Sequence, residues 1–324
     1  SKDDDVVTLN ITNTKKKGTV ITHHYVMEED GTTTTTKVPN KDGGVVEDIV
    51  QTGNVGDMYA TKEADNVSDN YEYVSSSGVT NGTIQEGTTE VIYYYKLKDT
   101  NVLVHHYIDG TETKVPNKNG GVVEDELIDG QVNDPYSTNP STDIANNYEL
   151  VTEKLPTNAN GNMVLDQIVV TYYYRLKTPT ITNQGITKTG TERITAPTQE
   201  INYTITYSAD IMDYIGDAEV TIVDTLPYAI DQAKSDIAGG TYNTENKTIT
   251  WTEDVIGLNS YEGNGTVTIT KNIKVVYIGL DMNQEKITNN VKGQIKLLTP
   301  EVTSEETTDE FESTIYKSII SSEK

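Results

Sequence analysis

The sequence predicts a mainly β chain made of two tandem repeats and a third domain with the strand pattern of a sandwich. Thr, Asn, Val, Ile and Tyr dominate its 324 residues, a bias typical of strands and turns. Apolar residues make up only 34%, and 21 Tyr outnumber one Phe and one Trp, so we expect thin, sheet-like cores. A segment of about 80 residues occurs twice before the pattern changes.

Charge and cysteine content exclude several classes of function. The chain has 25 Lys plus Arg against 50 Asp plus Glu, a net charge of −25, which would repel nucleic acid and anionic membranes. It has no Cys, which excludes disulfides, thiolate metal sites and a Cys nucleophile. No apolar run approaches membrane-spanning length. We expect residues 1–17 to be a linker or the end of a preceding domain, and residues 317–324 to be a linker to a following domain.

The internal repeat is the strongest organisational signal. Three motifs recur after about 77 to 82 residues: Thr22-His23-His24-Tyr25 as Val104-His105-His106-Tyr107, Lys37-Val38-Pro39-Asn40 as Lys114-Val115-Pro116-Asn117, and Tyr93-Tyr94-Tyr95-Lys96 as Tyr172-Tyr173-Tyr174-Arg175. Two units follow, at residues 18–98 and 99–177, with a third domain at 178–316. Each unit opens with a strand that ends in Tyr and closes with a Tyr-rich strand.

The order of these elements resembles the mucin-binding-protein (MucBP) repeats of Gram-positive surface proteins. A middle Gly-Asp-Met-Tyr element at 56–59 and a final Tyr-rich strand contribute to the match. The resemblance implies a β-grasp-like fold, an extracellular, cell-wall-associated location, and a host glycoprotein or mucin as a candidate partner.

The His and Tyr residues of the repeats are candidates for binding. Side chains alternate between the faces of a strand, so two adjacent His cannot easily chelate one ion; we expect no metal and no cofactor. Alternation groups His23 with Ile21 and His105 with Leu103, and we expect these two His to face the core. The candidate ligand-facing rings are Tyr93, Tyr95, Tyr172 and Tyr174, because exposed Tyr can stack on sugars.

Strand-like runs separated by turn signals predict a β-sandwich in the third domain. They lie at 201–207, 218–223, 248–251, 265–277 and 286–298, and Thr307 to Ile315 either completes the last sheet or leads into a further domain. Three polar residues share the apolar faces of their strands: Lys188 with Ile186, Asp224 with Ile222, and Asn289 with Ile287. Because an unpaired buried charge is costly, three such residues suggest one cluster.

The segments around these residues resemble CnaA-like domains of pilins and adhesins. The matching motifs are Ile186-Thr187-Lys188-Thr189-Gly190, Val223-Asp224-Thr225-Leu226-Pro227 and Ile287-Thr288-Asn289-Asn290. The resemblance implies an immunoglobulin-like fold and a self-made isopeptide bond between Lys188 and Asn289, with Asp224 as the proton shuttle. The doubled Asn leaves Asn290 as an alternative acceptor, although alternation favours Asn289.

Several alternatives stay open at this point. The trio could be only hydrogen-bonded, or Thr189 and Gln294 could form an ester. A hydrolase is poorly supported, because there is no nucleophile elbow and no metal-ligand spacing. We expect a monomeric, elongated stalk or adhesin segment that is not an enzyme beyond a single self-crosslinking turnover; the second hypothesis is a glycan- or mucin-binding module formed by the repeats.

Short connections between the repeats predict limited flexibility. No Gly- or Ser-rich linker interrupts residues 98–101 or 177–180. Small-angle scattering should therefore report an elongated particle, and a compact globule or a broad spread of end-to-end distances would contradict the stalk geometry.

Overall fold

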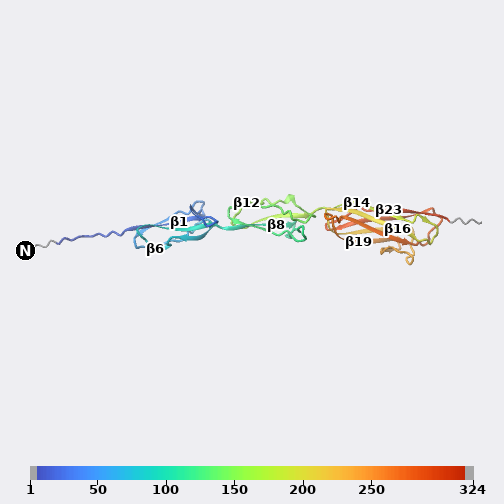
Figure 1. Cartoon of the computed structure of the whole chain (residues 1–324), viewed down its shortest axis with the longest axis horizontal. Helices are drawn as coiled ribbons and strands as arrows, with labels where there is room; N and C mark the ends of the chain where they lie inside the picture. Colours follow the sequence, from blue (N-terminus) through green and yellow to red (C-terminus); the bar gives the residue numbers. More distant parts are fainter. Residues whose placement is uncertain (1–5, 318–324) are drawn as a thin grey trace, which may run out of the picture. The chain divides into compact units, whose positions relative to one another are not determined.

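The computed structural model describes residues 6–317 and is built almost entirely from β-strands (Figure 1). The single helical element in this range is a short 3-10 turn, Thr152–Lys154. By the density of internal contacts the chain forms two compact units. One unit holds residues up to 106 with 124–140 and 154–172, and the other holds 107–123, 141–153 and the chain from 173 onward. The mainly β prediction is confirmed, and the division runs through the second repeat.

The first repeat is organised around a parallel pair of strands, as in a β-grasp fold. β1 (Lys17–Met27) and β7 (Gly87–Leu97) run in parallel, with Val20 opposite Thr89 and Tyr25 opposite Tyr94. The strands β2 (Thr33–Lys37), β3 (Ile49–Asn54) and β5 (Tyr71–Ser77) complete this sheet, and β4 (Met58–Ala60) and β6 (Asn81–Thr83) form a separate hairpin. Consecutive strands alone cannot give a parallel pair, so the long excursion between β1 and β7 is required.

The second repeat repeats these elements. Its strands are β8 (Asp99–Ile108), β9 (Glu126–Gln131), β10 (Pro135–Ser137), β11 (Tyr148–Leu150), β12 (Asn160–Asn162) and β13 (Ile168–Leu176). β8 pairs antiparallel with β9, β10 with β12, and β11 with β13. Alternate residues of β8 and β13 are buried, as the period of a half-buried strand requires.

In both repeats the buried histidine is not the one that the sequence analysis predicts. His24 and His106 are buried, at 0% and 4% exposure, whereas His23 and His105 lie on the outer face. His24 stacks on Tyr93 with ring centroids 5.5 Å apart, and His106 stacks on Tyr172 at 5.7 Å. The prediction that His23 and His105 face the core is therefore wrong: both faces of these strands are partly apolar, so alternation did not identify the inner one.

The third domain is a sandwich of two sheets. The smaller sheet has the order β14 (Thr180–Gly190), β16 (Ile201–Met212), β20 (Thr266–Val275). The larger has the order β15 (Arg193–Ile194), β23 (Thr307–Ile315), β21 (Lys286–Leu298), β17 (Ile215–Thr225), β19 (Thr248–Asn259), β18 (Thr241–Asn243), and β22 (Glu301–Thr303) also pairs with β21. Since β23 lies beside β21, residues 307–315 complete the sheet.

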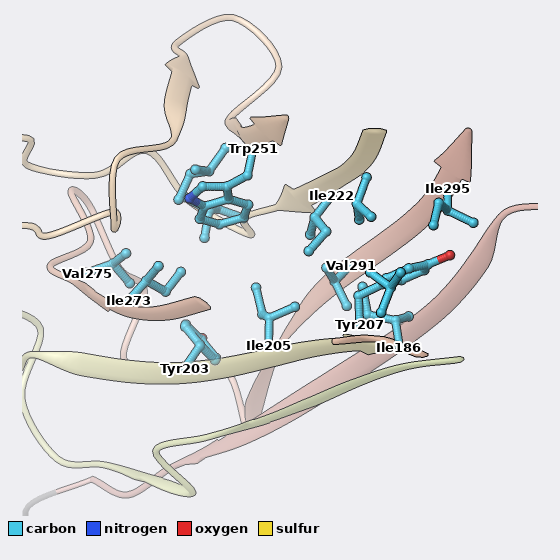
Figure 2. Close-up of a cluster of buried hydrophobic side chains, with 14 of the residues drawn as sticks. Ile186, Tyr203, Ile205, Tyr207, Ile222, Trp251, Ile273, Val275, Val291 and Ile295 are labelled. Carbon is cyan, nitrogen blue, oxygen red and sulfur yellow. The ribbon is translucent and has the colours of Figure 1, made fainter. Parts of the chain in front are cut away.

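Large apolar side chains from both sheets fill the sandwich. Figure 2 shows Tyr203, Ile205 and Tyr207 projecting from one strand toward Ile222 and Trp251 of the facing sheet. The Trp251 indole Nε1–H donates to the Ile237 carbonyl at 3.0 Å, which satisfies its polar end. Buried apolar side chains therefore surround the polar residues described below.

Buried histidine predicts a pH dependence of the first repeat. Burial lowers the pKa of His24 below 6.5, opposed by the nearby Asp48 charge, and its Nε2 has no hydrogen-bond partner within residues 6–317. The unfolded chain therefore binds a proton near pH 6.5 that the folded repeat resists, so stability falls as the pH drops through that value. Hydrogen exchange in β1 and β7 should accelerate between pH 7.5 and about 5.5, after correction for intrinsic rates.

Two internal controls are available for that experiment. The third domain contains no His, so its strands should not lose protection over the same range. His24→Phe keeps a ring against Tyr93 and should remove the acid sensitivity of the first repeat while the second keeps it. Equal sensitivity of all three domains would contradict the assignment to His24.

Candidate functional site

Three buried polar side chains meet in the core of the third domain. Lys188 lies on β14, Asp224 on β17 and Asn289 on β21, with exposures of 4%, 0% and 0%. β17 and β21 are neighbours in the larger sheet, whereas β14 belongs to the smaller one. Each residue shares the inward face of its strand with Ile or Val neighbours, so the alternation of apolar side chains aims all three into the sandwich.

The Asp224 carboxylate bridges the other two groups. Its Oδ1 contacts the Lys188 Nζ in a short ion pair, and its Oδ2 accepts a hydrogen bond from the Asn289 Nδ2 at 3.2 Å. The sequence placed these three residues on one inner surface, and the structure brings them into contact. The carboxyl thus contacts both the Lys188 amine and the Asn289 amide nitrogen.

Burial shifts both ionisable groups toward their neutral forms. It lowers the pKa of Lys188 to about 8, with the Asp224 charge opposing the shift. It likewise raises the pKa of Asp224, and the Lys188 charge and hydrogen bond oppose this. A neutral amine is a nucleophile, and a carboxyl that exchanges a proton with it can act as acid and base.

Neighbouring groups hold the lysine in place. The Lys188 backbone N–H donates to the Asp309 Oδ2 at 2.6 Å, which ties β14 to β23. The Tyr203 ring lies 4.7 Å from the Lys188 Nζ, and the Tyr203 and Tyr277 hydroxyl oxygens are 2.9 Å apart. Sequence reasoning missed Tyr203, because it is one of six alternating buried residues on a regular strand and nothing local distinguishes it.

The alternative bond partners lie on the other face of their strands. Asn290 is exposed and stands opposite Thr225 and Glu310. Thr189 is exposed as well, and the Gln294 Nε2 donates to the Ser304 carbonyl at 2.8 Å. A one-residue shift along a strand moves a side chain to the opposite face, so these residues do not reach the buried cluster.

The four Tyr expected to face ligand are buried instead. Tyr93, Tyr95, Tyr172 and Tyr174 have exposures of 5%, 2%, 2% and 0%. Their hydroxyls have partners inside the repeats, such as the Thr61 hydroxyl 3.0 Å from Tyr93 and the Thr138 hydroxyl 3.0 Å from Tyr172. On the two Tyr-rich strands the outward-facing rings are Tyr94 of β7 and Tyr173 of β13, both half-buried.

The outer faces also carry a matching pair of His–Asp contacts. The His23 Nδ1 lies 3.1 Å from the Asp48 Oδ1, and the His105 Nδ1 lies 3.0 Å from the Asp125 Oδ1. In the part of the chain that the structure describes, no three His, Asp or Glu side chains are arranged to hold a metal ion. Within residues 6–317, no helix has the length and apolar character needed to cross a membrane.

The repeats match a known family. The model of the MucBP domain matches residues 20–96 and 101–175. These two segments are MucBP domains. Each match begins within the first strand of its repeat and ends within the closing Tyr-rich strand, β7 in the first repeat and β13 in the second. No curated protein has significant sequence similarity to the chain.

Several solved structures of bacterial surface proteins align weakly with this chain. The collagen-binding domain of a Staphylococcus aureus adhesin is 13% identical over 40% of this chain and 96% of its own, with a TM-score of 0.24. BcpA, the major pilin subunit of Bacillus cereus, is 15% identical over 93% and 69%, with a TM-score of 0.25. The major pilin SpaD of Corynebacterium diphtheriae is 11% identical over 94% and 66%, with a TM-score of 0.26. TM-scores this low do not support a conclusion about the function of this chain.

Proposed function

We propose that this chain is a stalk segment of an extracellular, cell-wall-associated adhesin of a Gram-positive bacterium, stiffened by an isopeptide bond between Lys188 and Asn289. The two MucBP domains support the surface location. The observation that carries the crosslink is the unbroken contact from Lys188 through Asp224 to Asn289 in an otherwise apolar core. Groups so costly to bury are retained where they do chemistry or confer specificity.

The reaction balances with these three residues alone. The neutral Lys188 Nζ attacks the Asn289 Cγ, and the new C–N bond forms as the carbonyl becomes a tetrahedral centre. The Asp224 Oδ1 takes the proton that the attacking nitrogen loses, and the carboxyl gives a proton through Oδ2 to Nδ2. The bond from Cγ to Nδ2 then breaks and ammonia leaves. The carboxyl ends in its starting state, so each oxygen contact has a role.

Folding supplies the proximity that such a reaction needs. Amide formation from an unactivated amide is slow, but well-oriented groups can reach effective concentrations of roughly 10⁵ M or more. Water is excluded from this core, which strengthens the interactions of the carboxyl with both partners. A single turnover follows, and the product is the crosslinked domain itself.

The bond would connect the two sheets of the sandwich. Lys188 lies on the first strand of the domain, and Asn289 lies about 100 residues later, so by analogy with a disulfide of that loop size the crosslink contributes about 4.7 kcal/mol. Tension between β14 and β21 would pass through the covalent bond, and the intervening strands would not need to extend. Since the chain has no Cys, this bond takes the place of disulfides and cannot be reduced.

Intact mass tests this proposal. The purified protein should weigh one ammonia less than its sequence mass, and a tryptic digest should contain a branched peptide that joins Lys188 to Asn289. Lys188→Ala, Asn289→Ala and Asp224→Ala should each restore the full mass and lower the melting temperature, because the loop is no longer closed.

Asn290→Ala is the matched control, since Asn290 is exposed on the same strand and should leave the mass loss unchanged. A wild-type protein at full sequence mass would reduce the trio to a buried hydrogen-bonded network. Loss of the crosslink in Asn290→Ala, but not in Asn289→Ala, would mean that the assigned acceptor is wrong.

A second candidate function is binding of glycan or mucin by the repeats. It is favoured by the outer sheet faces, where Tyr94 and Tyr173 are half-buried and Val50 and Val169 of the same sheets are exposed. Apolar and aromatic surface of this kind suits the face of a sugar ring.

Glycan-array and immobilised-mucin assays test this function. Tyr94→Ala combined with Tyr173→Ala should weaken any binding severalfold, because stacking surface is removed. Tyr316→Ala is the control, as this Tyr is 43% exposed but lies outside both repeats. Binding that is indifferent to the double substitution, or that is absent in the wild type, would leave the stalk role without a ligand-binding one.

A further inference from the structure

The strand β23 contacts both of the strands that carry the reacting groups. It pairs antiparallel with β21, where Phe311 stands opposite Asn289. Two residues earlier on β23, the Asp309 Oδ2 accepts the hydrogen bond from the Lys188 backbone N–H at 2.6 Å. Asp309 and Phe311 lie on the more buried face of β23, as residues two apart on a strand must share a face. Three residues of β23 therefore connect the Lys188 backbone to the Asn289 backbone.

The contact at Asp309 belongs to a longer seam. β14 is an edge strand of the smaller sheet, and β16 pairs with one of its two sides. The backbone groups on the other side need separate partners. Residues from Gln184 to Ile194 meet residues 305–316 there, and the two segments run in parallel. The further contacts are Gln184 Nε2 to the Glu305 carbonyl at 2.6 Å, Ser313 Oγ to the Thr191 carbonyl at 2.7 Å, and the Thr314 and Tyr316 backbone N–H groups to the Glu192 and Ile194 carbonyls, each at 2.8 Å.

The strand β23 also reaches the amine end of Lys188, through two aromatic rings. Phe311 is the one Phe of the chain, and its ring lies edge-on to Tyr203 with the centroids 6.2 Å apart. The Tyr203 ring in turn lies 4.7 Å from the Lys188 Nζ. A Lys side chain has a flexible four-carbon stem, so the position of its nitrogen depends on how well its backbone is fixed. Asp309 fixes that backbone from the strand that also holds Asn289.

We propose that Asp309 is a positioning residue for the crosslinking reaction, holding the Lys188 backbone at the distance from Asn289 that attack on Cγ requires. This inference rests on the proposed isopeptide bond. Asp309 exchanges no proton: the bond from Nζ to Cγ forms, the bond from Cγ to Nδ2 breaks, and ammonia leaves with the proton that Asp224 carries. A misplacement of about 1 Å can slow a reaction about 100-fold, so a contact with the backbone can control the rate.

The position of Asp309 in the chain has a consequence for the order of events. Asp309 follows Asn289 in the sequence, and it reaches Lys188 only when β23 has paired with β21. The bond then forms after this strand has docked, when both sheets of the sandwich are already joined along the seam. Crosslinking before that point would fix β14 and β21 together without β23 beside them.

The rate of crosslinking tests the proposal. The full chain is made by cell-free translation, samples are quenched in denaturant at intervals, and the fraction that has lost ammonia is read by mass spectrometry. Asp309→Ala removes the acceptor for the Lys188 N–H and should slow the reaction about 10- to 100-fold. Asp309→Asn keeps a side-chain oxygen at the same position, and should restore a rate close to that of the wild type.

Glu310→Ala is the matched control. Glu310 is the next residue of β23, is exposed, and stands opposite Asn290, so its loss removes a negative charge without touching the seam. It should crosslink at the wild-type rate. In an Asn289→Ala background, where no bond can form, each Asp309 variant should unfold cooperatively above the temperature of the rate measurement. Asp309→Ser has a shorter polar side chain, should give an intermediate rate, and replaces Asp309→Ala if that variant does not fold.

The outcomes are distinct. An Asp309→Ala rate equal to that of the wild type would overturn the positioning role and leave the isopeptide bond intact. Asp309→Asn as slow as Asp309→Ala would also overturn it, since the lost charge and not the lost contact would then be responsible. Equal slowing by Glu310→Ala would do the same. No mass loss in the wild type would instead refute the proposed function from which the inference starts.

Discussion

The third domain depends on how the desolvation of one lysine and one aspartate is offset. Both side chains are buried, so each charge would be strongly destabilising without the other, and burial drives both groups toward their neutral forms. The second oxygen of the Asp224 carboxyl accepts a hydrogen bond from Asn289, and the Tyr203 ring covers the Lys188 amine. The arrangement that makes the charges tolerable is therefore the same arrangement that holds an amine, a carboxyl and an amide in contact.

The geometry of the sandwich explains how residues from three different strands can meet. Asp224 and Asn289 lie on adjacent strands of the larger sheet, where Asp224 is opposite Val291, so their separation follows from the register. Lys188 comes from the facing side of the sandwich, and its backbone is bonded to Asp309 of β23, next to β21. A long side chain is needed to cross from β14 to the carboxyl, and Lys has that length. The Gly at 293 lets the Tyr207 ring pack against β21, since a Cβ there would approach it within 2.7 Å.

The sequence predicted the strands, the two repeats and the trio, because each depends on a local period or on a motif. Alternation works for Lys188, Asp224 and Asn289 because their strands have one clearly apolar face. It failed for the repeats, where Ile21, His23 and Tyr25 alternate with Val20, Thr22 and His24 and both sets are partly apolar. The period shows which residues share a face, but the choice of the inner face depends on the loops that cover the sheet. Tyr203 was not predicted because its contacts with Lys188 and Tyr277 join strands that are far apart in sequence.

Tyr dominates the aromatic residues because the rings of the repeats have to do two things. In each repeat a ring fills the thin core while its hydroxyl holds a covering loop: Tyr95 accepts from the Ala64 backbone N–H at 3.0 Å, and Tyr174 accepts from the Ser141 backbone N–H at 2.8 Å. Phe would fill the same space but leave these N–H groups to find other partners, which a loop over a small core does not readily provide. The 21 Tyr and one Phe are thus a consequence of small cores without disulfides. In the third domain the core is larger, and there two buried Tyr satisfy each other, because the Tyr203 and Tyr277 hydroxyl oxygens lie 2.9 Å apart.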